Sequence, residues 1–305
     1  MRLFPLRDAL PLQRTSIAGH AEGGVDDAPP ATVTFYQATP AKTAPTIEIV
    51  DARGCVVRRI DGTHEDDEGN DVPNVPNNAG LNRVVWNLDE TPPTPWRRAA
   101  KWDRGTDGGV AVLSGTYTVR LHRDGMTYTQ PIRVLRDRRV RSDLDERAGY
   151  ALARTLYRQL DELDTALKGL DNVRVQLGER TPSLNEPTLA VRANGVLAAA
   201  RSLESSISSQ PVNDQDNDFL RDLLRERVLS MIGNIAPGTP PQAQRDETAS
   251  LERETRDAVA HYGAFVANHV VPLNAALKSA GIAVVNLDAL PPKTKPDPNA
   301  DERAR

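Results

Sequence analysis

Residues 80–88, Gly80-Leu81-Asn82-Arg83-Val84-Val85-Trp86-Asn87-Leu88, hold an asparagine–arginine pair, a tryptophan and a second asparagine within nine positions. Side chains of an extended strand alternate between two faces, which places Val84, Trp86 and Leu88 together on one face. This alternation predicts a half-buried β-strand whose inner face carries the tryptophan. We therefore expect Asn82 to fix the geometry of the strand and Trp86 to fill a core.

The same period of two extends from residue 31 to about residue 135. Six runs rich in Val, Ile, Thr, Tyr and Phe are separated by turn residues, which predicts strands at 32–37, 46–50, 55–60, 81–88, 116–121 and 126–134. In the fifth run, the residues predicted to face inward are Tyr117, Val119 and Leu121. Short strands in this number and spacing predict an immunoglobulin-like antiparallel β-sandwich over residues 31–140.

From Ser142 onward the apolar residues recur with a helical period. Ser142 and Asp145 predict a capping box at the start of a helix. Behind it, leucines with heptad-like spacing are predicted to face a core: Leu152, Leu156, Leu160, Leu163, Leu167, Leu170 and Leu177. Three further apolar stripes follow, at 189–207, at 216–235 and from an N-cap at Thr239 to Gly281, the last predicted to bend at Pro272.

Four amphipathic segments joined by short polar loops predict an antiparallel four-helix bundle over residues 142–285. The expected fold class is therefore α+β, with two domains. Residues 1–30 are expected to form an extended linker segment before the first domain. Residues 286–305 are charged and contain several prolines, which predicts a disordered tail.

The composition excludes several classes of partner. The chain has 305 residues and a formal net charge of −4, which gives no general attraction to nucleic acid. No apolar run approaches the roughly 20 residues that a membrane span needs. The first residues, MRLFPLRDALPLQ, lack the apolar block of a signal peptide. We therefore expect no nucleic acid partner and no membrane span, and the compartment stays open.

Standard catalytic and metal-binding patterns are missing from the sequence. The phosphate-binding GxxxxGK[ST], dinucleotide-binding GxGxxG, nucleophile-elbow GxSxG and zinc-binding HExxH patterns do not occur. His261 and His269 are eight residues apart, too far to share a metal on one helix. The single cysteine, Cys55, is expected to be a small buried thiol, the alternative being a reactive nucleophile. We expect no catalytic residue, no cofactor and no bound metal.

Two charged stretches each allow two interpretations. The acidic stretch at 61–71, DGTHEDDEGND, is expected to be a solvated hairpin tip, and a calcium site is the alternative. The stretch at 133–143 contains five arginines. These are expected to form salt bridges at the surface or with acids of the first helix, and phosphate contact is the alternative.

The aromatic loop at 93–105, PTPWRRAAKWDRG, also allows two interpretations. Trp96 and Trp102 flank Arg97, Arg98 and Lys101. Packing of the two tryptophans over the open end of the sandwich is expected. A platform on which a carbohydrate stacks is the alternative.

The motif at 80–88, followed by SGTYTVRL at 114–121, resembles an element of known bacterial proteins: Gly-x-Asn-x-hydrophobic-hydrophobic-Trp-Asp and then Pro-Gly-x-Tyr. This element occurs in the immunoglobulin-like domain shared with flagellar hook-capping proteins. The whole chain to about Leu287 resembles the C-terminal region of bacterial sortilin-like, glycosyl-hydrolase-labelled β-propeller exoproteins. Shorter similarities support this resemblance: Leu3 to Arg7, Ala28 to Ala31, Pro272 to Leu277, and Ala280-Gly281.

The sequence departs from the family pattern at Asn87, Ser114 and Ala28, where aspartate, proline and asparagine are usual. The propeller itself is missing, and no Asp-box (Ser-x-Asp-x-Gly-x-x-Trp) occurs in the chain. The family's hydrolase label therefore transfers to no residue here. The family is typically exported.

The expected function is that of a non-catalytic accessory or interaction module that binds a protein or a β-propeller domain. One alternative is a carbohydrate- or cell-surface-binding module that uses Trp96 and Trp102. The other is a glycoside-acting enzyme, for which Asp89 and Glu90 are the first candidate acids, because they directly follow the tryptophan strand.

Overall fold

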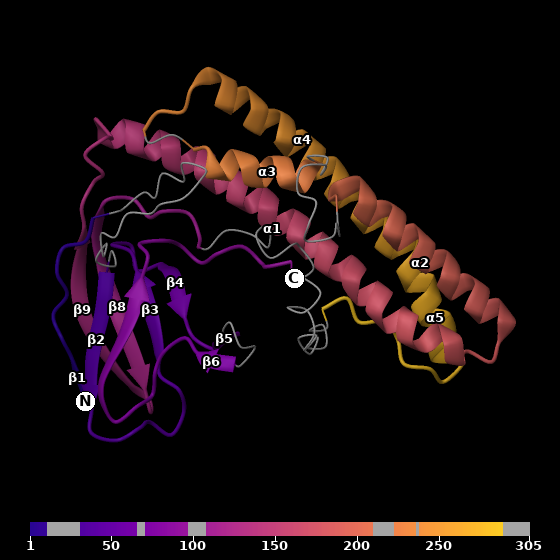
Figure 1. Cartoon of the computed structure of the whole chain (residues 1–305), viewed down its shortest axis with the longest axis horizontal. Coiled ribbons are helices and arrows are strands. Elements are labelled where there is room, and N and C mark those ends of the chain that lie inside the picture. The colour runs from indigo at the N-terminus through magenta and orange to yellow at the C-terminus, as the bar shows by residue number, and fades with distance from the viewer. Residues whose placement is uncertain (11–30, 66–70, 97–107, 210–222, 236–237, 289–305) are drawn as a thin grey trace, which may run out of the picture.

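The computed structural model describes residues 1–10, 31–65, 71–96, 108–209, 223–235 and 238–288. It is a mixed α+β structure in which a β unit lies at one end of the molecule and a long helix runs away from it (Figure 1). Further helices pack along that long helix. Two separate hydrophobic clusters, one in the β unit and one among the helices, form the core.

Two antiparallel sheets make up the β unit. The first has the strand order β1-β2-β7, formed by Arg2–Leu3, Ala31–Gln37 and Gly80–Trp86. The second has the order β4-β3-β8-β9, formed by Val56–Ile60, Thr46–Val50, Gly115–Arg123 and Met126–Val134. A separate hairpin pairs β5, Thr63–Glu65, with β6, Asp71–Pro73. The strand runs predicted from the sequence are therefore present, although their ends differ.

The inner faces of both sheets contribute to one hydrophobic cluster. Its members include Val33, Phe35, Ile47, Ile49, Val84, Trp86, Leu88, Tyr117, Val119 and Leu121. The predicted inward residues of the fourth and fifth runs are all buried, so that prediction is confirmed. Strand β7 ends at Trp86 rather than at Leu88, because Leu88 adopts a φ of 60°, in the left-handed region that a strand does not use.

The first ten residues belong to the β unit. Leu3 pairs with Phe35 across β1 and β2. Ala9 donates its N–H to the carbonyl of Arg133 at 2.8 Å and accepts from the N–H of Leu135 at 2.8 Å. Both Leu3 and Ala9 are buried. The expected linker at 1–30 is therefore wrong for residues 1–10, and residues 11–30 lie outside the described residues.

Cys55 is exposed, so the prediction of a buried thiol is wrong. Strand β4 begins one residue later than predicted, at Val56. Cys55 instead completes a turn in which its N–H donates to the Asp51 carboxylate at 2.8 Å. The apolar run Cys-Val-Val does not lead to burial here, because Val56 is exposed as well.

The first helix, α1, spans Asp143–Arg180 and is capped as predicted, because the Ser142 side chain accepts from the N–H of Asp145. All seven leucines of its predicted apolar stripe are buried. The remaining helical elements are η1 at Thr181–Ser183, α2 at Pro187–Ile207, α3 at Leu224–Gly233, α4 at Gln242–Phe265, a π-helical segment at Val266–Val270 and α5 at Val271–Ser279. Figure 1 shows that α3 and α4 lie along the first half of α1, and that α2 and α5 lie along the second half.

The fourth helix departs from its predicted start. Helix α4 begins at Gln242 after Pro241 and has no side-chain cap, so the N-cap prediction for Thr239 is wrong. The Thr239 hydroxyl instead donates to the carboxylate of Asp145. This contact ties the segment before α4 to the first turn of α1.

At the position of the bend predicted for Pro272, the structure has a π-helical segment, Val266–Val270, that ends two residues before the proline. A proline lacks the N–H that a regular helix requires, and a wider turn accommodates this loss. The helix ends at Ser279, and Gly281 follows with a φ of 71°, close to the predicted end.

Candidate functional site

Trp86, the centre of the motif at 80–88, is held by the backbone around it. Its indole Nε1 donates to the carbonyl of Asp89 at 2.9 Å. Its ring meets Tyr117 edge to face, with ring centroids 5.8 Å apart. The Tyr117 hydroxyl in turn donates to the carbonyl of Leu113 at 2.8 Å. Burial raises the pKa of Tyr117 well above its usual value, so this hydroxyl stays a donor.

Asn82 closes the turn that precedes its own strand. Its side-chain oxygen accepts from the N–H of Asn78 at 3.0 Å, and its amide nitrogen donates to the Asn78 carbonyl at 2.8 Å. The residue is buried, so these backbone groups satisfy a side chain that is shielded from water. Asn82 and Trp86 therefore have the structural roles that the sequence predicts.

Asp89, one of the two candidate acids, is buried beside an arginine. Its Oδ2 lies 3.4 Å from Arg58 Nη1 and accepts from the N–H of Gly109 at 2.9 Å. A Cβ at Gly108 would lie 2.4 Å from the same oxygen, and a Cβ at Gly109 would lie 2.1 Å from the Glu90 carbonyl. Only glycines allow this approach, so the backbone at Gly108 and Gly109 packs directly against Asp89 and Glu90.

Glu90, the other candidate acid, connects the β unit to α1. Its carboxylate accepts from the Tyr150 hydroxyl and lies 3.6 Å from Arg154 Nε. Burial, and then the bond to Glu90, raise the pKa of Tyr150 to about 12. The Glu90 carbonyl also accepts from Arg58 Nη1 at 2.9 Å. Asp89 and Glu90 therefore hold neighbouring segments together through different partners.

Trp96 lies far from the place that the sequence suggested for it. It follows β7 in the chain, yet its side chain is 1% exposed and belongs to the hydrophobic cluster of the helices. Its Nε1 donates to Asp171 Oδ2 on α1 at 2.6 Å. Packing over the open end of the sandwich is therefore wrong for Trp96, and a buried ring offers no face on which a carbohydrate stacks. Trp102, Arg97, Arg98 and Lys101 lie outside the described residues.

A buried ion pair packs against the Trp96 ring. Arg225 on α3 places its Cζ 5.2 Å from the centre of that ring. Its Nε donates to Asp164 Oδ1 on α1 at 2.5 Å, and both side chains are fully buried. Burial raises the pKa of Asp164, and the Arg225 guanidinium acts against that shift. This pair was not predicted, because a single arginine and a single aspartate in two helices carry no local pattern.

Two more contacts contribute to the junction between the β unit and α1. The N–H of Thr94 donates to Asp161 Oδ1 on α1 at 2.7 Å. Ser114 donates to Glu146 from both its N–H and its hydroxyl, at 2.8 and 2.7 Å. Thr94, which follows β7, and Ser114, which precedes β8, are therefore both bonded to the first half of α1.

The arginine-rich stretch at 133–143 also contributes to this junction. Arg136 pairs with Asp143 and lies 3.9 Å from Glu146, both in the first turn of α1. Arg139 pairs with Asp137 at 2.6 Å. The predicted salt bridges are thus confirmed for these two arginines.

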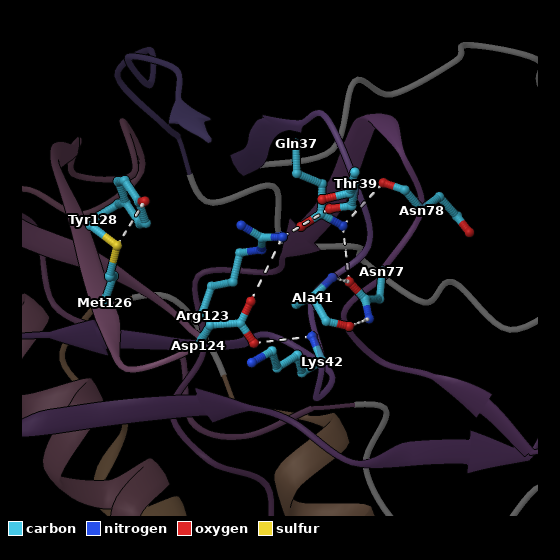
Figure 2. A network of polar contacts seen from close by, with 10 residues as sticks. All are labelled: Gln37, Thr39, Ala41, Lys42, Asn77, Asn78, Arg123, Asp124, Met126 and Tyr128. Carbon is cyan, nitrogen blue, oxygen red and sulfur yellow. Dashed lines mark hydrogen bonds and ion pairs between the residues drawn. The ribbon is translucent and has the colours of Figure 1, made fainter.

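A second polar network lies where β2 ends, and its residues are drawn in Figure 2. The Gln37 amide donates to Asn77 Oδ1 at 2.9 Å and to the Asn78 carbonyl at 3.0 Å. Asn77 both accepts from the N–H of Ala41, at 2.7 Å, and donates to its carbonyl, at 3.0 Å. The network therefore joins the segment after β2 to the segment before β7, through one bond between side chains and three bonds to backbone.

The same network reaches the β8–β9 hairpin. Arg123 Nη2 donates to the Thr39 carbonyl at 2.9 Å, and Asp124 Oδ1 accepts from the N–H of Lys42 at 3.0 Å (Figure 2). Asp124 has a φ of 47°, which places it at the tip of the tight turn. These bonds hold the loop after β2 against the second sheet.

A groove with a volume of about 280 Å³ opens between β4 and β7. Arg58, Arg59 and Asp61 line it on one side, and Arg83, Val84 and Val85 line it on the other. Sequence reasoning missed this groove because its walls belong to different sheets. The only available signal was the exposed arginine between apolar residues in the motif at 80–88.

The part of the chain that the structure describes contains no group of three or more His, Cys, Asp or Glu side chains placed to hold a metal. The acidic stretch at 61–71 contains β5 and the first residue of β6, which pair as a hairpin, while residues 66–70, where its tip and the alternative calcium site would fall, lie outside the described residues. Within the described ranges, each helix is too short or too polar to cross a membrane.

Comparisons of the chain with protein-family models, with curated proteins and with solved structures found no significant match.

Proposed function

We propose that this chain is a non-catalytic accessory or interaction module, related to the C-terminal region of sortilin-like β-propeller proteins. In this proposal, the two sheets are an immunoglobulin-like sandwich and the helices are an antiparallel four-helix bundle. The hydrogen bond from Tyr117 to the Leu113 carbonyl supports the first assignment. A tyrosine near the start of a strand that bonds upstream backbone is typical of immunoglobulin-like domains.

The observation that carries the proposal is that the carboxylates of Asp89 and Glu90 are both bound by groups of the protein itself. Asp89 is enclosed by Arg58 and the Gly109 backbone, and Glu90 is bound by Tyr150 and Arg154. A glycosidase instead needs two carboxylates across a cleft that admits a sugar, at roughly 5 to 9.5 Å, with one of them protonated. Asp89 and Glu90, the candidate acids from the sequence, instead form hydrogen bonds and ion pairs that stabilise the fold.

The second candidate function, a carbohydrate-binding module, is favoured by no contact in the described residues. The residue on which it depended, Trp96, is enclosed by the helices. An interaction module requires instead a rigid body that presents a surface to its partner. The junction through Trp96, Thr94 and Ser114 supplies that rigidity.

We expect the purified chain to show no turnover of sialoside, glucoside or arabinoside reporter substrates, even at high protein concentration. Release of the chromogenic group is the measurement, and a known glycosidase assayed in parallel controls for the substrates. Turnover that survives repurification and is lost in Asp89→Asn or Glu90→Gln would overturn the proposal, provided that the circular dichroism spectrum shows the variant to be folded.

A further inference from the structure

The groove between β4 and β7 lies where two sheets end. Strand β7 is the last strand of the first sheet, and β4 is the last strand of the second. A terminal strand has one side without a neighbouring strand, and such a side can pair with an extended segment of another chain. The backbone of β4 already accepts from the N–H of Thr91 at Val57, so β7 is the strand of this groove that is suited to receive another strand.

Three arginines line this groove, and two of them are paired with carboxylates. Arg58 is paired with Asp89, and Arg59 is paired with Asp61 at 2.5 Å. Arg83 is exposed, and no carboxylate among the described residues pairs with it. Its guanidinium is therefore available to bind an anionic group from outside.

Two apolar side chains flank Arg83 on the same outer face of β7. Leu81 is 54% exposed and Val85 is 48% exposed, each two residues away from the arginine. Tyr36 lies directly opposite Leu81 on β2 and is 46% exposed. The outer face of β7 therefore reads apolar, positive, apolar with the period of a strand.

We propose that this face docks an extended acidic segment of a partner protein, added as a strand beside β7. The segment carries the pattern apolar-x-acid-x-apolar, so that its acid meets Arg83 and its apolar residues meet Leu81 and Val85. Cross-strand pairs of opposite charge and of apolar residues are both stabilising. This inference rests on the proposed function, because it names the surface and the partner chemistry of an interaction module.

A second copy of the chain suits this face poorly. Arg83 is the central residue of the seven in β7, Gly80–Trp86. Symmetric antiparallel pairing of two β7 strands about their centres would place Arg83 opposite Arg83. Like charges directly opposite each other destabilise a strand pair, so the arginine favours an acidic partner over self-association.

The test uses the full chain and three fluorescent peptides with free ends blocked: Val-Thr-Asp-Thr-Val, Val-Thr-Asn-Thr-Val and Val-Thr-Lys-Thr-Val. Fluorescence anisotropy gives the dissociation constants for the wild-type chain, for Arg83→Glu and for the control Arg133→Glu, an exposed arginine on β9. We expect the wild type to bind the aspartate peptide, with affinity that falls about tenfold in Arg83→Glu and is kept in Arg133→Glu. The Arg83→Glu variant should instead prefer the lysine peptide.

The inference is overturned if the aspartate peptide does not bind at about millimolar concentration, the weak end of specific binding. It is also overturned if Arg83→Glu binds that peptide as well as the wild type does. A wild-type chain that elutes as a dimer, and as a monomer after Arg83→Glu, would assign the face to a second copy and overturn the acidic partner. Failure of the peptide leaves the absence of turnover intact, whereas turnover contradicts the proposed function whatever the peptide does.

Discussion

Replacing Trp96 with alanine is expected to lower the free energy of unfolding by about 3–5 kcal/mol, the usual cost of deleting a buried large aromatic side chain. The ring fills space in the helical core, bonds Asp171 at 2.6 Å and covers the Arg225 guanidinium. Its removal leaves a cavity beside a buried ion pair. Urea unfolding followed by helical circular dichroism measures the change.

The matched control for this experiment is Tyr36→Ala, which removes an aromatic side chain that is 46% exposed. Exposed substitutions usually change stability by less than about 0.5 kcal/mol, so the control should be close to the wild type. A loss below about 1 kcal/mol in Trp96→Ala would mean that the ring does not fill the helical core.

The second large effect is expected at Trp86, where alanine should also cost about 3–5 kcal/mol. Trp86 packs edge to face on Tyr117 and donates to the Asp89 carbonyl, both within the β unit. Trp86→Phe keeps an aromatic ring but loses the donor, so its cost should be clearly smaller. Denaturant unfolding followed by the far-ultraviolet β signal gives both values, and equal losses in the two variants would contradict the role of ring volume.

Regular periodicity made several features predictable. The inward faces of the strands at 81–88 and 116–121 follow from alternation alone, and the Ser142 cap and the leucine stripe of α1 follow from local spacing. Each of these is decided by residues within a few positions of one another. The inward faces of the strands are fixed because one whole face is buried, and a shift of the strand register by one residue would expose that face.

Features that depend on contacts between distant segments were missed. Trp96 lies in an irregular loop, and only the packing of α1 and α3 decides that its ring enters their core. The predictions for Cys55 and Thr239 were wrong because a shift of one or two residues at the end of an element changes a residue's role. The groove at Arg83 depends on how two sheets meet, which no local pattern encodes.

The same contacts explain why the motif at 80–88 is structural. The strand it forms fills the core of the β unit through Trp86. The segment behind it crosses to the helices, where Glu90, Thr94 and Trp96 are each bound by α1. The stretch from residue 80 to residue 96 thus contributes side chains to both hydrophobic clusters and connects the β unit to the helices.

Differential scanning calorimetry of the full chain and of Trp96→Ala tests this central claim most directly. If Trp96 couples the β unit to the helices, the wild type should unfold in one cooperative transition, because the segment that leaves β7 is anchored in the helical core and the contacts it makes are shared by both units. The variant should then show two separated transitions, with the helical one at lower temperature. Two transitions in the wild type, at temperatures that Trp96→Ala leaves unchanged, would contradict the claim that this stretch joins the two units.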